Sequence, residues 1–164
     1  MDFEKLSDDE LVQSYGSLLK ELKRRGIIRS KNIVGDLGEY IAIRHYNTTP
    51  GLPKLQAAPP GTQNVDALSR TGDRYSIKSI TGNVTGVFYG LPPKGSDETP
   101  EKKFEFVIIV VFNNDYTVKR IIELIWAQFL EFKRWHSRMN AWNVPINKEV
   151  LEKAKTIYST DGAS

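Results

Sequence analysis

Hydrophobic residues recur at helical spacing near the start of the chain. Four of them follow at intervals of four, three and four residues and so share one helix face: Leu11, Tyr15, Leu18 and Leu22. The stretch Ser7–Glu10 has the Ser-x-x-Glu form of a capping box, and Gly26 follows a basic run where a helix would end. The pattern predicts a first helix over about 7–25.

A second helix is expected over about 32–46. Gly35, Glu39 and Ala42 share one of its faces, with small residues a turn on either side of the carboxylate. Gly35 and Gly38 each cost about 1 kcal/mol relative to alanine inside a helix, which suggests that this face approaches a sheet closely. We therefore expect Glu39 to reach a site over the sheet, the alternative being a solvated glutamate.

Two short strands are predicted after an irregular segment at 47–63. They cover about 64–69 and 74–80, with Thr71–Asp73 as a three-residue turn. This register would place Asp66 opposite Lys78.

Side chains alternate between the two faces of a strand. Asp66, Ser76 and Lys78 would therefore share one face, and Ile77 would lie on the other. The two polar groups of the pair would then be neighbours across the hairpin.

The apolar run at 107–111 indicates a strand buried on both faces. It lies within a second predicted hairpin, formed by 104–112 and 116–126. The remaining segments are expected to form a long exposed loop at 81–103 and helices at about 127–137 and 147–158.

Composition narrows the class of protein. A chain of 164 residues is expected to form one domain, and its net charge of +3 with a pI of about 9.0 leans mildly toward polyanionic partners. The absence of cysteine and the presence of only two histidines argue against thiolate or histidine-rich metal sites. No apolar run is long enough to cross a bilayer, so the sequence predicts a cytoplasmic protein that does not enter membranes.

Two carboxylates and a lysine are the candidate chemistry of the chain. If Glu39, Asp66 and Lys78 meet at a sheet edge, they could hold a divalent cation and a water beside a phosphodiester. The alternatives are local: Asp66 could cap the glycine turn, and Lys78 could be a solvated edge residue.

The order of these elements resembles the PD-(D/E)XK, or restriction-endonuclease-like, nuclease superfamily, and in particular its small bacterial members. The residues that carry the resemblance are Gly38-Glu39 with Ala42, Val65-Asp66-Ala67, and Ser76-Ile77-Lys78. The resemblance covers about 32–131 of a single domain at 1–164, with the first and last helices as additions. It implies an α/β fold with a three-layer core, in which helices flank a mixed central sheet.

The resemblance also implies roles for the site residues. Asp66 would be the main ligand of Mg²⁺, with Mn²⁺ as a substitute, and the backbone carbonyl of Ile77 would be a second ligand. Glu39 would reach the metal directly or through water. Lys78 would orient or deprotonate the attacking water and stabilise the charge that develops on the phosphate.

One position departs from the family pattern. Ser76 stands where most members carry an acid, which removes a negative charge from the metal site and weakens the expected affinity for Mg²⁺. Gln63 and Asn64 are auxiliary candidates that could hydrogen-bond the phosphate or orient Asp66.

The expected activity is hydrolysis of phosphodiester bonds, with DNA as the expected partner. Arg44, Lys54 and Arg74 flank the expected cleft and could contact phosphates. A homodimer, with the first helix as a possible interface, would present two sites to a duplex. The alternatives are a nucleic-acid-binding module that has lost cleavage and a protein-interaction module on the same fold.

Overall fold

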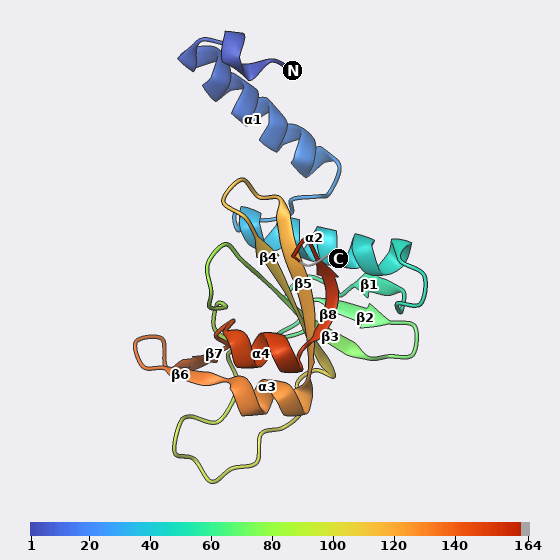
Figure 1. Cartoon of the computed structure of the whole chain (residues 1–164), viewed down its shortest axis with the longest axis vertical. Coiled ribbons are helices and arrows are strands. Elements are labelled where there is room, and N and C mark those ends of the chain that lie inside the picture. The colour runs from blue at the N-terminus through green and yellow to red at the C-terminus, as the bar shows by residue number, and fades with distance from the viewer. Residues whose placement is uncertain (162–164) are drawn as a thin grey trace.

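A six-stranded mixed sheet forms the centre of the protein. The computed structural model describes residues 1–161 and is shown in Figure 1. The strands of the sheet, in spatial order, are β1 (Leu55–Ala57), β2 (Ala67–Ser69), β3 (Arg74–Ile80), β4 (Phe106–Phe112), β5 (Val118–Ile125) and β8 (Lys155–Ser159). β3 and β4 are parallel, and the other neighbours are antiparallel. A separate antiparallel pair consists of β6 (Arg134–His136) and β7 (Ala141–Asn143).

Helices flank both faces of this sheet. The helices in chain order are the short 3-10 helix η1 (Phe3–Lys5), α1 (Asp8–Arg24), α2 (Ile33–Thr48), α3 (Trp126–Phe132) and α4 (Lys148–Lys153), and those that cover the sheet are α2, α3 and α4. Residues of α2 pack into the core on one face, and residues of α3 and α4 pack into the core on the other. The predicted α/β class, with a mixed sheet between helices, is confirmed.

The central strand shows why two cores form. Val107, Ile109 and Val111 of β4 belong to the core beneath α3 and α4, whereas Ile108 and Val110 belong to the core beneath α2. Alternate side chains of a strand point to opposite faces, so an uninterrupted apolar run suits burial on both. The prediction of a strand buried on both sides is confirmed.

Two predicted helices are shorter than expected. The helix expected to reach residue 137 ends at Phe132, because 134–143 forms the β6–β7 pair. The helix expected to reach residue 158 ends at Lys153, and β8 then pairs with β5. The run Thr156-Ile157-Tyr158 is β-branched and aromatic, which favours a strand wherever a neighbouring edge is available. The short strand β1 also lies within the segment expected to be irregular.

The predicted register of the β2–β3 hairpin is wrong by two residues. Ala67 pairs with Tyr75, and the loop is Arg70–Gly72, with Gly72 at a φ of +88°. In three-residue hairpin loops the left-handed position is the last one, so glycine belongs there and not in the middle. Extending this register places Asp66 opposite Ser76, not opposite Lys78. A shift of two residues leaves every side chain on its predicted face.

Close contact between α2 and β3 depends on one glycine. A Cβ at Gly38 would lie 1.6 Å from the Ser79 hydroxyl oxygen and 2.5 Å from the Ser79 Cβ. Gly38 and Ala42 are buried against the sheet, and α2 therefore lies close to it. Gly35 has a different role, because a Cβ there would meet the side chain of Asn32 that caps the helix.

A buried hydrogen bond also ties α2 to the sheet. The Tyr46 hydroxyl donates to a carboxylate oxygen of Glu123 on β5 at 2.6 Å. Burial, followed by the charge of Glu123, raises the pKa of Tyr46 well above its ordinary value, so the phenol stays a donor. The buried carboxylate is thereby satisfied.

The parallel pairing of β3 and β4 requires a long connection, residues 81–105. Its first part runs back beside the β6–β7 pair, where Phe88 forms an isolated bridge with Trp142. Phe88 is buried in the core beneath α3. The segment expected to be a loop is therefore anchored over residues 84–88 and exposed over most of 94–99.

The first helix stands apart from the rest of the molecule (Figure 1). The predicted capping box at Ser7 and Glu10 is present, and the helix ends at Arg24 before Gly26, which has a φ of +72°. No residue of α1 is buried. Among residues 1–161, no helix combines the length and hydrophobicity needed to cross a membrane.

Candidate functional site

Asp66 occupies the point where the β2–β3 hairpin stops pairing. It immediately precedes β2, and one oxygen of its carboxylate accepts a hydrogen bond from the backbone N–H of Ile77 at 2.7 Å. The side chain thus takes the place of a neighbouring strand for that N–H group, which would otherwise lack a partner. This contact fixes the position of the carboxylate at the edge of β3.

Glu39 reaches the same edge from α2. Its side chain is only 18% exposed and forms an ion pair with Arg29. Burial, followed by the negative charge of Asp66, raises the pKa of Glu39, although Arg29 opposes the shift. The effect of the Asp66 charge on the pKa of Glu39 indicates that the two carboxylates lie near each other.

Asp66 also responds to charges on both sides of the site. Its pKa is raised by burial, against the opposing effects of the Ile77 N–H group, Lys78 and Arg29. The positive charges of Arg29 and Lys78 therefore both act on Asp66.

Lys78 lies on the face of β3 opposite α2. Its ammonium donates to the backbone carbonyl of Val87 at 3.0 Å and sits 4.6 Å from the centroid of the Phe88 ring. Burial lowers the pKa of Lys78, and the charge of Asp66 opposes the shift. By strand alternation Asp66 and Lys78 share a face, although the structure places no direct ion pair between them.

The other predicted site residues line the same region. Ser76 is almost fully buried and shares a face of β3 with Lys78. Ile77 is buried on the other face, on the α2 side. Asn64, with a φ of +60°, donates through its side-chain amide to the Tyr89 carbonyl at 3.0 Å.

The connection after β3 closes this side of the site. The side chain of Gln63 lies against Gly90, beside the contact between Asn64 and Tyr89. Because Lys78 is bonded to Val87, residues 87–90 form a wall along the lysine and the loop before β2.

Arg29, the cation that pairs with Glu39, was not expected from the sequence patterns. The Asp36 carboxylate accepts hydrogen bonds from the backbone N–H groups of Arg29 at 2.8 Å and of Ser30 at 2.6 Å. An acid in the first turn of α2 thus fixes the preceding linker and directs Arg29 toward Glu39. The short linker before an acidic first turn was the only sequence signal available.

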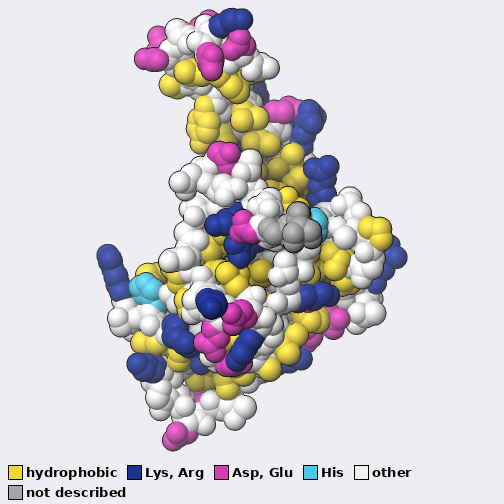
Figure 2. All heavy atoms as spheres, in the orientation of Figure 1, with side chains coloured by type: hydrophobic (Ala, Val, Ile, Leu, Met, Phe, Trp, Pro, Cys, Tyr) yellow, Lys and Arg dark blue, Asp and Glu magenta, His cyan; other side chains and the backbone are white. Residues whose placement is uncertain are grey.

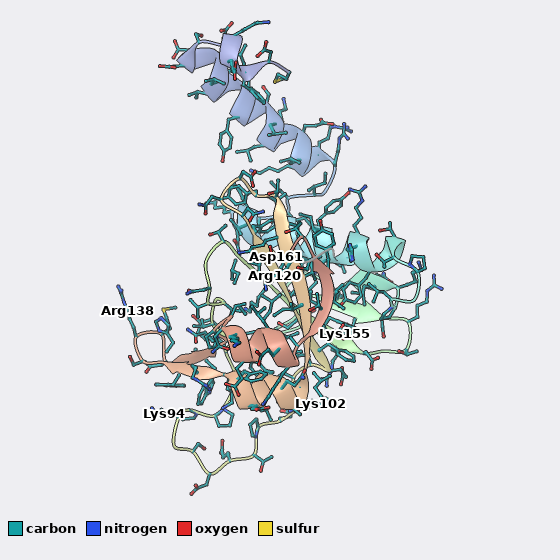
Figure 3. The ribbon with its side chains drawn as sticks, in the orientation of Figure 1. Lys94, Lys102, Arg120, Arg138, Lys155 and Asp161 are labelled. Atoms are coloured by element: carbon teal, nitrogen blue, oxygen red, sulfur yellow. The ribbon has the colours of Figure 1, made fainter. Side chains whose placement is uncertain are left out.

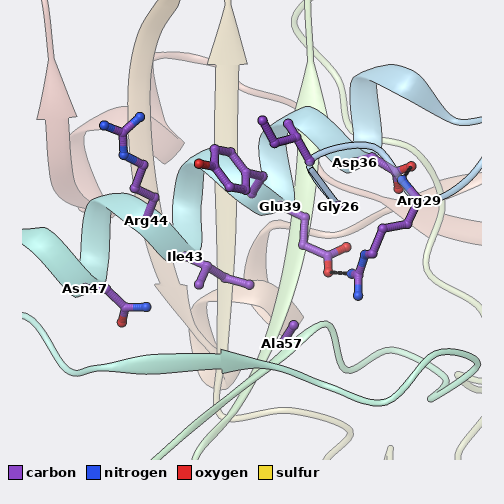
Figure 4. Close-up of a pocket in the computed structure, with 10 residues that line it drawn as sticks. Gly26, Arg29, Asp36, Glu39, Ile43, Arg44, Asn47 and Ala57 are labelled. Carbon is purple, nitrogen blue, oxygen red and sulfur yellow. Dashed lines mark hydrogen bonds and ion pairs between the residues drawn. The ribbon is translucent and has the colours of Figure 1, made fainter. Parts of the chain in front are cut away.

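A cavity of about 410 Å³ lies beside this ion pair (Figure 4). Arg29 and Glu39 are at one end, Arg44 is at the other, and Ala57 of β1 forms part of the floor. Of the predicted phosphate contacts, only Arg44 lines this cavity.

The other two predicted phosphate contacts bond within the protein. Lys54 donates to the Asn47 carbonyl at 2.6 Å, and Arg74 forms an ion pair with Glu105 at 2.9 Å. The Arg74 side chain lowers the pKa of Glu105 to about 2. These contacts hold β1 and β3 in place.

The donors suit one hard cation. Within residues 1–161, no group of three or more Asp, Glu, His or Cys side chains is arranged to hold a metal. Glu39 and Asp66 nonetheless supply two desolvated carboxylates, and the charge of Asp66 raises the pKa of Glu39, an effect that a divalent cation would relieve. Arg29 now partly neutralises the same charge.

Comparison with protein-family models and with curated proteins finds no match to this sequence.

Proposed function

We propose that the protein is a metal-dependent nuclease that hydrolyses phosphodiester bonds in DNA, on a restriction-endonuclease-like fold. The observation that carries the proposal is the position of Asp66, whose carboxylate is fixed at the edge of β3 by the Ile77 N–H group and whose charge affects the pKa of Glu39 on α2 and of Lys78 on β3. These three residues come from separate segments, and each is partly withdrawn from solvent. Burial of paired acids and a lysine at one sheet edge is costly for stability and is common at functional sites.

Each side chain has a role in this proposal. Asp66, held by the Ile77 N–H group, and Glu39 would hold Mg²⁺ or Mn²⁺. The metal, when bound, supplies Lewis acidity and lowers the pKa of its water. Lys78 would contact the attacking water and the phosphate, and the burial that lowers its pKa makes it easier for its ammonium to give up a proton.

A basic ribbon supports nucleic acid as the substrate. Residues 132–148 contain no acid, and they include β6, β7 and the turn between them. Lys133 lies 3.4 Å from the centroid of the Trp142 ring, and Figure 3 shows Arg138 at the tip of the ribbon, pointing away from the body. Basic side chains also gather around this projection in Figure 2. Two-stranded ribbons fit the major groove of DNA.

The ribbon is connected to the proposed site. Trp142 bridges to Phe88, which lies under the ammonium of Lys78. A duplex held by the ribbon would therefore approach the lysine side of Asp66, where the scissile phosphate must lie.

The proposal is tested with purified protein and supercoiled plasmid in Mg²⁺, in Mn²⁺ and in chelator. We expect nicking only with metal, and we expect Lys78→Met to reduce the rate about 10²-fold, as loss of one proton-transfer group typically does. Lys155→Met is the matched control, because Lys155 is exposed on the edge strand β8. Equal nicking by the wild type and Lys78→Met would refute the assigned site.

Binding without cleavage is the second candidate function. Ser76 lacks the acid expected at its position, and the guanidinium of Arg29 already pairs with Glu39. A protein of this kind would retain salt-dependent DNA binding but leave the plasmid intact with either metal.

Removal of Arg29 should separate these two candidates. In the nuclease, Arg29→Gln removes a cation that competes for the carboxylates, so we expect Mn²⁺ to bind about ten-fold more tightly by calorimetry. Arg24→Gln is the control, because Arg24 pairs with Glu21 on the exposed helix α1. Unchanged, undetectable Mn²⁺ binding in both variants would support the binding module.

A further inference from the structure

Helix α1 exposes its hydrophobic face. Tyr15 is 58% exposed and Leu18 is 54% exposed, although their spacing is that of a core-facing helix. An isolated helix of this length is only marginally stable in water without a partner that covers its apolar face. We therefore expect another molecule to cover the apolar face of α1.

The apolar face continues into η1. A groove of about 660 Å³ runs between η1 and α1, and its lining includes Phe3, Leu6, Leu11, Tyr15 and Leu18. Figure 2 shows hydrophobic side chains gathered on the part of the molecule that projects from the body, where Figure 1 places α1. A contiguous exposed patch of this kind marks an interaction surface.

The charges along α1 identify the partner. Its first turn carries Asp8, Asp9 and Glu10, and its last turn carries Lys23 and Arg24. An antiparallel copy of the same helix would set acidic turns against basic turns at both ends, whereas a parallel copy would set like charges together. The helix dipoles also favour the antiparallel arrangement.

The hydrophobic spacing fixes a register for this pairing. In an antiparallel pair Tyr15 would meet Leu18 of the second copy, and Leu11 would meet Leu22, so the stripe is complementary to itself. The next position of the same seam at each end carries Asp8 and Arg25. The register that joins the apolar residues therefore also joins these two opposite charges.

We propose that α1 forms an antiparallel homodimer with α1 of a second copy through this stripe. The body of each copy follows the C-terminal end of its own α1, so the two bodies lie at opposite ends of the helix pair. The face that is exposed in one copy becomes the core of the interface. This inference does not rest on the nuclease proposal.

Sedimentation analysis of the full chain tests the dimer. We expect the wild type to be dimeric and Leu18→Glu to be monomeric, with the thermal unfolding of the body unchanged because Leu18 is exposed. Lys20→Glu is the control, because it also places a glutamate at an exposed position, on the side of the helix away from the stripe and outside the groove, and it should remain dimeric. A monomeric wild type, or a dimeric Leu18→Glu, would overturn the proposal.

A charge exchange tests the orientation. Asp8→Arg and Arg25→Asp should each weaken the dimer about ten-fold or more, since each sets like charges against each other at both ends of the seam. The double variant restores opposite charges only in the antiparallel register, and we expect it to recover most of the affinity. No recovery in the double variant would contradict the register. Neither readout depends on metal or DNA.

Discussion

Asp66→Asn is expected to reduce metal-dependent DNA cleavage at least 10³-fold while leaving the fold as stable as the wild type or more stable. The carboxylate is the central metal ligand of the proposed site, and the loss of such charge stabilisation typically costs several kcal/mol in the transition state. Asparagine has the same shape and retains an oxygen that can accept the Ile77 N–H group. The two effects, on activity and on stability, therefore separate.

The stability effect has a defined pH dependence. Burial raises the pKa of Asp66 in the folded protein, so the folded state binds this proton more tightly than the unfolded chain does. The contribution of Asp66 to stability is fully present below its unfolded pKa and is lost as the pH rises through the raised folded pKa. Urea unfolding without metal should therefore show Asp66→Asn gaining stability over the wild type as the pH rises through that window.

Asp97→Asn provides the control for both measurements. Asp97 is exposed in the long connection after β3, and its replacement should change neither cleavage nor stability. Cleavage by Asp66→Asn within ten-fold of the wild type would exclude Asp66 as the metal ligand, whatever the stability result.

Gly38→Ala is expected to destabilise the fold by about 2 kcal/mol or more and to lower cleavage as well. The new Cβ would overlap both side-chain heavy atoms of Ser79, at 1.6 Å and 2.5 Å, so α2 must move away from β3. Glu39 follows Gly38 directly and would move with the helix. Urea unfolding and plasmid nicking measure the two consequences.

A second substitution tests this explanation. Ser79→Gly removes both overlapping atoms, and the buried Ser79 hydroxyl has no hydrogen-bond partner to lose. We expect Gly38→Ala/Ser79→Gly to recover much of the lost stability and of the lost cleavage. Gly16→Ala, in an exposed helix with nothing within 4 Å of the added Cβ, should be neutral or slightly stabilising. Failure of the double variant to recover either property would mean that the overlap is not the cause.

Sequence patterns predicted several features of this fold correctly, because interactions between residues close in the sequence determine those features. The capping box at Ser7 and the apolar run at 107–111 each determine their structure with little help from distant residues. The prediction that α2 approaches the sheet closely was correct at Gly38, because a glycine inside a helix costs stability and is explained here by the close contact. The same inference was wrong at Gly35, where the reason is the capping side chain of Asn32.

Features that depend on distant partners were missed. Strand β8 forms because β5 offers an edge, and the pattern of 155–159 alone could not reveal that edge. Arg29 reaches Glu39 because Asp36 fixes a linker, which is again a contact between segments. The predicted hairpin register was wrong because Gly72 is the last residue of the loop and not the middle one. The error is two residues, an even number, so Asp66 and Lys78 stay on the same face.

The parallel pairing of β3 and β4 requires a long connection, and part of that connection can change in length at little cost in stability. Residues 87–90 of the connection contact Lys78 and Asn64, but the exposed residues 94–99 do not support the sheet. Doubling the length of such a loop costs only about 0.6 kcal/mol in closure entropy. Insertions there would leave the sheet and the contacts of residues 87–90 in place, which makes this stretch the natural place to add new sequence without refolding the domain.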